Sequence, residues 1–534
     1  MEESEFKLGQ RVHSTGDPRR IGTVTYVGPV QSYSGIWVGV DWDNGDGKHD
    51  GSINGVRYFH AKSQRSGSFA RPHTLSSGIS LLQALRLRYQ GDSTQEEEDE
   101  MYVLSASNKR VSIQLVGKDK VQDKLSRFEE LTGASLSFLG VSSPGSPGDI
   151  GNVVPNLKEL DLTGNLLSDW KDVGTICREL PNLQVLNLSY NLMVQDVVQL
   201  PQLESIRVLV LNDTDVNWAK VEILKQSLPA IEELHLMGNN ISTIDPPSSL
   251  TVQGFDSLRL LNLEDNCIAD WNEILKLSQL RSLEQLHLNK NNLNRVFYPD
   301  NDTIHELSSD CELHEENDEP FQNLRCLLLG ANNLEDPASI DVLNSFPKLV
   351  DIRLSDNPIA DPGRGGIPRF VLIARLAKVE VLNGSEVSNR ERKESEIRYV
   401  RLVMSKLQGN LEDIQRLHPR FAELKEFHGI DDEKPSTGAD GPQKMASGLL
   451  SITLKCVGAS VGEKAPLTKK LPGATTVGKL KILCESFFKL KSVKLKLFLQ
   501  EEGSPLPILL DDEMASLMDV GIGNGSIILV DEES

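Results

Sequence analysis

Leucines recur at a regular spacing through the middle of the chain. Leu157, Leu160 and Leu162 are followed by Asn165, and this short pattern returns every 23 to 27 residues, apart from one 41-residue step after Leu283. Neighbouring side chains of a strand point to opposite sides, so the last two leucines of each copy lie on one side of a short strand. The copies begin at Leu157, Leu183, Ile206, Ile231, Leu258, Leu283, Leu324 and Leu349.

This period predicts a leucine-rich-repeat solenoid, in which each repeat adds one strand to a stack. The leucines line the inner side of the strand, and the asparagine is expected to bond turn backbone that burial would otherwise leave unpaired. In the copy that begins at Ile206, Thr214 stands in the asparagine position. A weaker first copy begins at Leu131, and a strand at 379–382 followed by a charged helix is expected to cover the far end.

The pattern changes at both ends of the solenoid. After the polar segment 431–447, residues 449–456 read as a strand, "TVGKLKILCESFFKL" has helical spacing, and "VKLKLFL" and "GSIILV" read as further strands. Strands packing on one helix predict a ubiquitin-like β-grasp domain. The predicted fold is a multidomain α+β chain: a small β-barrel head (1–75), a linker and solenoid cap (76–130), the solenoid with a helical cap (131–430), a linker (431–447) and the β-grasp domain (448–534).

Charge is distributed unevenly over these regions. The formal net charge is -21, and residues 76–447 hold 37 basic against 58 acidic residues, which is the whole imbalance. The head beyond residue 5 holds nine basic against five acidic residues. Nucleic acid is therefore an improbable partner, whereas the head suits an acidic peptide. We expect a cytoplasmic protein with no membrane segment, because the start lacks an apolar signal region and the six cysteines are scattered.

The loop "VGVDWDNGDGKHDGS" (38–52) concentrates acids and glycines with one lysine and one histidine. A calcium loop counted from Asp41 fails, because Gly45 stands at its fifth position and Ser52 at its twelfth. A phosphate loop fails because His49 follows Gly47-Lys48 where serine or threonine is required. A glycine-rich hairpin without a ligand and a peptide-binding loop remain.

The head resembles a CAP-Gly domain over nearly its whole length. Gly47-Lys48-His49-Asp50-Gly51 falls where that family has Gly-Lys-Asn-Asp-Gly, and both tryptophans and the closing Ser68-Phe69-x-Arg71-Pro72 keep the family's spacing. The resemblance implies a small β-barrel that grips the acidic C-terminal tail of α-tubulin, Glu-Glu-Tyr. Lys48 would offer charge, the glycines close backbone approach, and Trp37 and Phe69 an aromatic pocket, with Trp42 in the core. The residues expected to bind the tail are Trp37, Gly47, Lys48, His49, Asp50, Gly51, Phe69 and Arg71.

CAP-Gly head, leucine-rich repeats and ubiquitin-like end, in this order, resemble the tubulin-folding cofactor E family of tubulin-specific chaperones. The resemblance implies binding of α-tubulin, and assembly and dissociation of the α/β-tubulin heterodimer together with the other tubulin-folding cofactors (B, C and D). It also implies a cytoplasmic, cytoskeleton-associated protein whose ubiquitin-like end contacts the proteasome. No cofactor or metal is expected.

The sequence is also compatible with alternative functions. An enzyme is disfavoured, because the chain has no nucleotide loop and no nucleophile elbow. A microtubule-associated adaptor and a proteasome-linked adaptor remain as alternatives. The acidic insertion 300–320 contains His305, Cys311 and His314, whose spacing fits no standard zinc site, so a solvated loop is expected there.

Overall fold

The computed structural model describes most of the chain. The acidic run at 96–100, residues 300–319 of the predicted insertion with His305, Cys311 and His314, and the linker 431–447 lie outside the described residues. The described residues are 6–90, 102–104, 110–112, 127–193, 200–246, 251–299, 320–361, 366–406, 411–430, 449–457, 465–473, 475–489, 494–500, 507–510, 513, 516–517, 520, 522–523 and 525–532.

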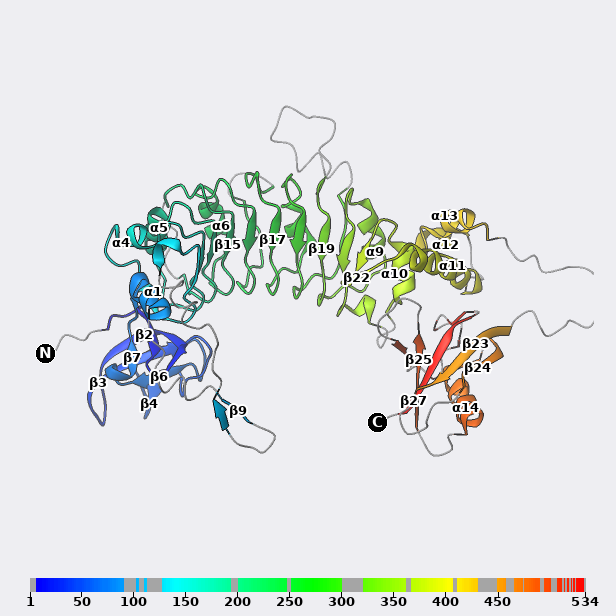
Figure 1. Ribbon diagram of the computed structural model, residues 1–534, viewed down its shortest axis with the longest axis horizontal. Coiled ribbons are helices and arrows are strands. Elements are labelled where there is room, and N and C mark those ends of the chain that lie inside the picture. The colour runs from blue at the N-terminus through cyan, green and yellow to red at the C-terminus, as the bar shows by residue number, and fades with distance from the viewer. Residues whose placement is uncertain are drawn as a thin grey trace, which may run out of the picture. The chain divides into compact units, whose positions relative to one another are not determined.

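The head is a five-stranded antiparallel sheet in the order β6-β3-β2-β1-β7, with a separate hairpin β4-β5 (Figure 1). Its core is built from alternate residues of the long strands, and Trp42 is buried there with Val38 and Val40, as expected. The strands are β1 (Arg11–Ser14), β2 (Asp17–Val30), β3 (Tyr33–Trp42), β4 (Ser52–Ile53), β5 (Val56–Arg57), β6 (Gly67–Ala70) and β7 (Leu75–Ser76).

A short segment connects the head to the first repeat. β8 (Ile79–Ser80) pairs in parallel with β12 (Val141–Ser143), and helix α1 (Leu81–Tyr89) follows β8 directly. Ser80 caps this helix by accepting a hydrogen bond from the backbone N–H of Gln83, whose side chain bonds back to Ser80. Next come the pair β9 (Tyr102–Leu104) and β10 (Arg110–Ser112), and a 3-10 turn, η2 (Phe128–Glu130).

The solenoid is a parallel sheet with one short strand per repeat. Inner leucines face each other across the stack, so that Leu160 pairs with Leu186 and Leu186 with Leu209, and all three are buried. The strands are β11 (Gly133–Ser135), β13 (Glu159–Asp161), β14 (Val185–Asn187), β15 (Val208–Val210), β16 (Glu233–His235), β17 (Leu260–Asn262), β18 (Gln285–His287), β19 (Cys326–Leu328) and β20 (Asp351–Arg353). The leucine-rich-repeat prediction is confirmed.

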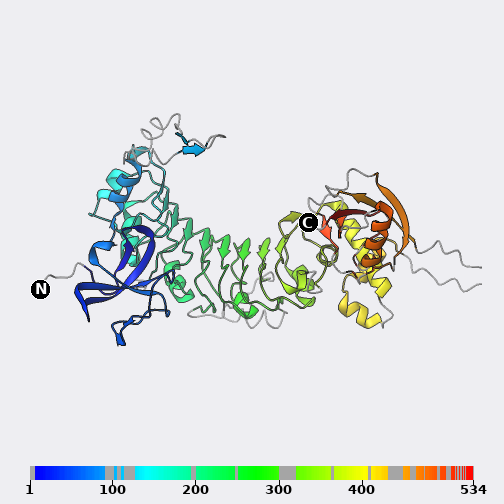
Figure 2. The same cartoon turned by 90° about the horizontal axis from the view of Figure 1, so that it is seen from below.

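Short helices lie on the opposite side of the repeats from the strands (Figure 2). They are α4 (Asp149–Val153), α5 (Trp170–Glu179), α6 (Trp218–Lys225) and α7 (Trp271–Leu275). Asp169, Asn217 and Asp270 cap the last three, each accepting a hydrogen bond from a first-turn N–H, and a buried tryptophan follows each cap.

The asparagine of each repeat bonds buried backbone, as predicted. Asn191 is fully buried; its Nδ2 donates to Leu162 O at 2.8 Å and Leu188 O at 3.0 Å, and its Oδ1 accepts from Leu167 N at 3.2 Å. In the exceptional repeat the hydroxyl of Thr214 donates to Leu211 O at 2.8 Å. Each asparagine therefore joins two adjacent repeats.

The remaining described residues form a second compact unit, which begins at Asp336. Its helical part packs around buried Phe370, Tyr399 and Leu424, and the strand expected at 379–382 is confirmed in a shorter form as β21. The elements are α9 (Ala338–Asp341), α10 (Arg369–Arg375), β21 (Val381–Leu382), β22 (Ser385–Glu386), α11 (Asn389–Lys406), α12 (Leu411–Leu417) and α13 (Phe421–Phe427).

The C-terminal domain has the predicted β-grasp fold. Its sheet has the order β24-β23-β27-β25-β26, with β23 and β27 parallel. Leu480 of α14 shares a buried core with Leu454 and Val530 of the sheet. The elements are β23 (Leu449–Cys456), β24 (Leu467–Pro472), α14 (Val477–Phe488), β25 (Leu495–Gln500), β26 (Ile508–Leu509) and β27 (Ile527–Glu532). Within the part of the chain that the structure describes, no helix has the length and apolar character needed to span a bilayer.

Candidate peptide-binding site

The loop 47–51 is held against strand β6 by backbone hydrogen bonds. The N–H groups of Lys48 and His49 both donate to Gly67 O, at 2.7 and 3.0 Å, and Gly67 N–H donates back to His49 O at 2.9 Å. A Cβ at Gly47 would lie 2.3 Å from the carbonyl carbon of Ser66, so this position requires glycine for close approach. Lys48 itself is exposed, and its side chain is free to reach a ligand.

Gly51 ends the loop in a conformation that only glycine adopts without strain. Its φ is +98°, and a Cβ would lie 2.0 Å from Phe59 O. The preceding residue fixes the turn: the carboxylate of Asp50 accepts from Ser52 N at 3.1 Å and forms an ion pair with Arg57 at 2.7 Å. The hydrogen bond from Arg57, followed by those from Ser52, lowers the pKa of Asp50 to about 2. Asp50 therefore positions the loop.

His49 makes the local hydrogen bond that an asparagine can also make. Its Nδ1 accepts from the backbone N–H of Gly51 at 3.0 Å, which assigns the ring proton to Nε2 in the neutral form. The ring packs against Phe69 and Phe59, with centroids 5.1 and 6.0 Å apart. Burial is the main cause that lowers the pKa of His49, with Asp50 acting in the opposite direction, so the imidazole is neutral at pH 7.

An aromatic cluster lies beside this loop. The ring of Phe69 meets those of Tyr26, Tyr58 and Phe59 edge-on, at centroid distances of 5.9, 5.4 and 5.4 Å. Gly39 pairs with Phe69 across the sheet and leaves room for a ring, since a Cβ there would lie 2.5 Å from Phe59 Cε1. Tyr26, Tyr58 and Phe59 were not identified from the sequence. A glycine amid large residues on a strand is the signal that could have found them.

Trp37 and Arg71 form a second pair on the same face of the sheet. Trp37 lies two residues before Gly39, and Arg71 two residues after Phe69. The guanidinium of Arg71 stacks 3.7 Å from the centre of the Trp37 ring, and its Nη1 donates to Ser34 O at 2.7 Å. Trp37 also meets Tyr33 at 5.9 Å, whereas Phe69 belongs to the first cluster, so the two expected pocket walls lie in adjacent groups.

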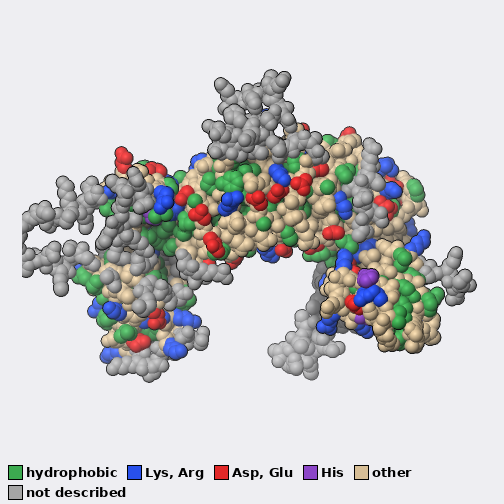
Figure 3. All heavy atoms as spheres, turned by 180° about the vertical axis from the view of Figure 1, so that it is seen from behind, with side chains coloured by type: hydrophobic (Ala, Val, Ile, Leu, Met, Phe, Trp, Pro, Cys, Tyr) green, Lys and Arg blue, Asp and Glu red, His purple; other side chains and the backbone are tan. Residues whose placement is uncertain are grey.

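The loop at 47–51 and the two aromatic groups bring cationic and aromatic side chains to one part of the head. Lys48 supplies an exposed ammonium, Arg71 a stacked guanidinium, and Phe69 with its neighbours a partly exposed aromatic surface. Figure 3 shows blue Lys and Arg side chains gathered beside purple histidines on the head. This chemistry suits a peptide that ends in an acidic stretch, an aromatic side chain and a free carboxylate.

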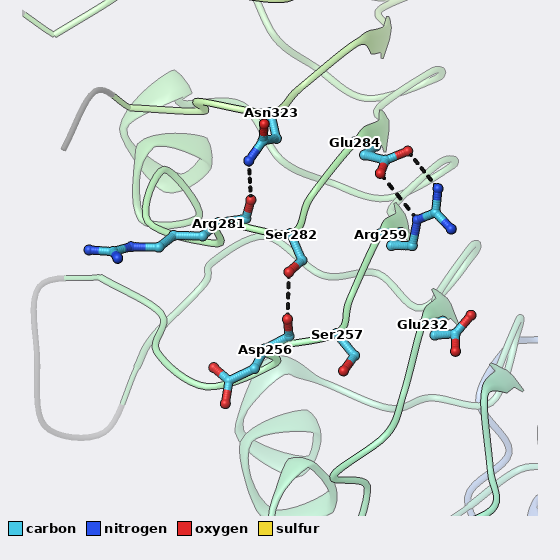
Figure 4. Close-up of a pocket in the computed structure, with 8 residues that line it drawn as sticks. All are labelled: Glu232, Asp256, Ser257, Arg259, Arg281, Ser282, Glu284 and Asn323. Carbon is cyan, nitrogen blue, oxygen red and sulfur yellow. Dashed lines mark hydrogen bonds and ion pairs between the residues drawn. The ribbon is translucent and has the colours of Figure 1, made fainter. Parts of the chain in front are cut away.

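A polar hollow lies on the surface of the solenoid. Its side chains are used between repeats: Ser282 Oγ donates to Asp256 O at 2.5 Å, Asn323 Nδ2 to Arg281 O at 2.7 Å, and Arg259 pairs with Glu284 at 3.0 Å (Figure 4). These bonds join successive repeats. Among the described residues no three His, Cys, Asp or Glu side chains are grouped to hold a metal ion.

Comparisons with known proteins identify the family of the chain. Residues 8–75 match the CAP-Gly domain family. The chain is 66% identical to tubulin-folding cofactor E of Arabidopsis thaliana over 530 residues, covering 99% of this chain and 98% of that one, and 32% identical to tubulin-specific chaperone E of Danio rerio, covering 98% of each. The solved ubiquitin-like domain of mouse tubulin-specific chaperone e aligns with 18% of this chain and 96% of its own length, at 27% identity and a TM-score of 0.15. The chain therefore belongs to the tubulin-folding cofactor E family, also called tubulin-specific chaperone E.

Proposed function

We propose that this protein is a tubulin-folding chaperone that holds α-tubulin at two places, the C-terminal tail in the head and the body on the repeats. The observation that carries the proposal is the surface of the head that holds the exposed Lys48 and, on the next residue, the ring of His49 packed on Phe69. The same face of the sheet carries the aromatic cluster around Phe69 and the stacked pair of Arg71 and Trp37. An acidic tail that ends in tyrosine offers negative charges to the two cations and an aromatic ring to the aromatic side chains.

Each group has a distinct role in the proposed grip. The two cations neutralise the glutamates and the terminal carboxylate, and the partly exposed rings pack on the terminal tyrosine. Gly47 and Gly51 bring the loop backbone close to the ligand, and Asp50 and His49 keep the loop in shape through Arg57 and the amide of Gly51. The proposed grip requires no bound cofactor, and the action that we propose for the protein is binding.

Assembly and dissociation of the α/β-tubulin heterodimer follow from differential binding. A tail grip alone has equal affinity for free and dimeric α-tubulin, and such a ligand shifts no equilibrium. Moving a balance from 1:99 to 99:1 takes about 5.5 kcal/mol of preference for one state. The repeats therefore contact the dimer-facing or adjacent surface of α-tubulin, and the tail grip raises the effective concentration of that contact.

The same proposal covers partners and location. The protein works in the cytoplasm, associated with the cytoskeleton, together with the tubulin-folding cofactors B, C and D. Its β-grasp domain serves as a docking surface for the proteasome.

The test is loss of tubulin dimers in the presence of the purified chain. Doubly labelled α/β-tubulin should lose its intersubunit energy transfer when full-length protein is added. Removal of residues 1–75 should slow this loss, and removal of the repeats should abolish it. A chain that binds polymerised microtubules while leaving dimers intact would instead be an adaptor, and the proposed function would be wrong.

A further inference from the structure

The outer surface of the solenoid sheet has an apolar centre. We call this surface the strand face; it is formed by the residues that flank each inner leucine, from Glu159 and Asp161 on β13 to Asp351 and Arg353 on β20. On this face Val185 pairs with Val208, and Val210 is the next outward residue of β15; all three valines are partly exposed.

Tyr190, just after β14, adds an aromatic ring to this centre, because 52% of its surface is exposed. The valines and the tyrosine come from two adjacent repeats. Solvent-facing apolar patches bounded by polar side chains are typical of protein-binding surfaces.

Acidic side chains surround this apolar centre. Asp161 precedes it on β13, Glu233 and Glu264 follow on the next repeats, and Asp213 and Asp265 lie just beyond the ends of β15 and β17. Glu233 pairs with Val208 in the sheet, so acid and valine are direct neighbours. The strand face is therefore negative where the head is positive.

Asp213 and Asp265 are kept close by the glycine between them. Gly238 occupies the equivalent position in the intervening repeat, and a Cβ there would lie 2.4 Å from Asp213 Oδ1. Burial is the main cause that raises the pKa of Asp213; the hydrogen bond with Tyr190 acts in the opposite direction, and the charge of Asp265 adds to the rise. The charge of Asp213 is the main cause that raises the pKa of Tyr190. The two carboxylates therefore place negative charge side by side at the edge of the strand face.

We propose that the strand face between β13 and β17 binds a basic, partly apolar protein surface. Lysine or arginine side chains of the partner meet Asp213 and Asp265, and its apolar side chains cover Val208 and Val210. Charge complementarity around an apolar centre gives both orientation and affinity. The inference rests on the proposed function in one respect, because it assigns this surface to the body of α-tubulin.

The two binding surfaces then select opposite charges. An acidic tail is repelled from the strand face and is left to the head, while a basic surface is repelled from the head loop that carries Lys48. This division orients the partner along the chain without a new contact.

The test uses the full-length chain and two probes. The first probe is a synthetic amphipathic helical peptide of lysines and leucines, with a glutamate-leucine peptide as its counterpart. The second is purified α/β-tubulin. Asp213→Asn with Asp265→Asn removes two charges and suits both positions, since each has a positive φ that asparagine tolerates. Val208→Thr with Val210→Thr keeps branched strand residues but removes apolar surface.

The matched control removes two charges away from the strand face. Glu204→Gln with Asp256→Asn acts on exposed carboxylates in the loops before β15 and β17. The lysine-leucine peptide should bind the unmodified chain and the control with the same affinity. Its affinity for the Asp213/Asp265 variant should be about tenfold lower, and its affinity for the valine variant should fall by less. The glutamate-leucine peptide should not bind the strand face.

The outcomes separate the two proposals. Equal peptide affinity for the Asp213/Asp265 variant and the control would overturn the inference, because only net charge would then matter. Normal tubulin binding by the Asp213/Asp265 variant would also overturn it. If no form of the chain bound tubulin while the peptide results held, the proposed function would fall and the basic partner would be another protein.

Discussion

Replacing Lys48 by alanine removes the exposed cation of the loop at 47–51 without disturbing the loop. The loop is held by the backbone N–H groups of Lys48 and His49 on Gly67 O, at 2.7 and 3.0 Å, and alanine keeps both. A hydrogen bond to a charged group contributes about 1.5–3 kcal/mol, and an exposed ion pair about 0.2–1 kcal/mol. Lys48 is exposed in the free chain, and a bound tail would cover it only in part. We therefore expect a loss of about 1.4 kcal/mol, which is a tenfold rise in Kd.

The assay is fluorescence anisotropy of a labelled peptide ending in Glu-Glu-Tyr, titrated with the full-length chain. Lys48→Arg should retain most of the affinity, because the charge remains. Lys7→Ala is the matched control, since Lys7 is also exposed in the head and its backbone N–H, rather than its ammonium, bonds Gln10. An unchanged Kd for Lys48→Ala, or an equal loss for Lys7→Ala, would refute a specific contact between Lys48 and the tail.

Three further predictions concern the geometry behind this site and the solenoid. Gly51→Ala should abolish tail binding and lower the melting temperature of the head, because its Cβ would lie 2.0 Å from Phe59 O. Gly45 also has a positive φ, +74°, but open space around it, so Gly45→Ala should keep tail binding and lower the melting temperature much less; equal loss in both would argue against the clash. Asn191→Ala should lower the free energy of unfolding of the solenoid by about 2–5 kcal/mol, because buried backbone groups lose their partner. Gln184→Ala, at an exposed position, should leave the free energy of unfolding unchanged, and hydrogen exchange of the neighbouring strands measures the stability of both variants. Burial lowers the pKa of His49 below 6.5, so the stability that its neutral form contributes is complete above about pH 6.5 and is lost as the pH falls below that value. The melting temperature of the head, measured against pH, should show this loss in the unmodified chain and not in His49→Asn.

The repeats could be predicted from the sequence because their packing is local and periodic. Each strand falls on the middle leucine of its copy, as β13 does on Leu160, and each asparagine bonds its own turn and the preceding repeat. A second set of repeat-to-repeat bonds was not predicted: Asn156 Nδ2 donates to Glu129 O at 2.8 Å, and Asn182 Nδ2 to Pro155 O at 3.1 Å. Each of these asparagines comes just before the first leucine of a copy. An exposed side chain is expected at that position, so the sequence gave no reason to predict a hydrogen bond between repeats there.

The head site could be predicted only in part. The loop around Lys48 is one continuous stretch, so its glycines and charges are visible in the sequence. The rings around Phe69 come from separate segments, β2 for Tyr26 and the stretch after β5 for Phe59, and antiparallel pairing brings them together. The role of Asp50 was also out of reach, because it depends on Arg57 across the β4-β5 hairpin.

The central claim is that the head reads the last residue of α-tubulin. The most direct measurement is the Kd of the full-length chain for α/β-tubulin before and after enzymatic removal of the terminal tyrosine. The account predicts clearly weaker binding after removal, because the aromatic cluster around Phe69 loses its ligand ring and the carboxylate moves out of reach of the cations. Equal affinity for the two forms of tubulin would contradict it.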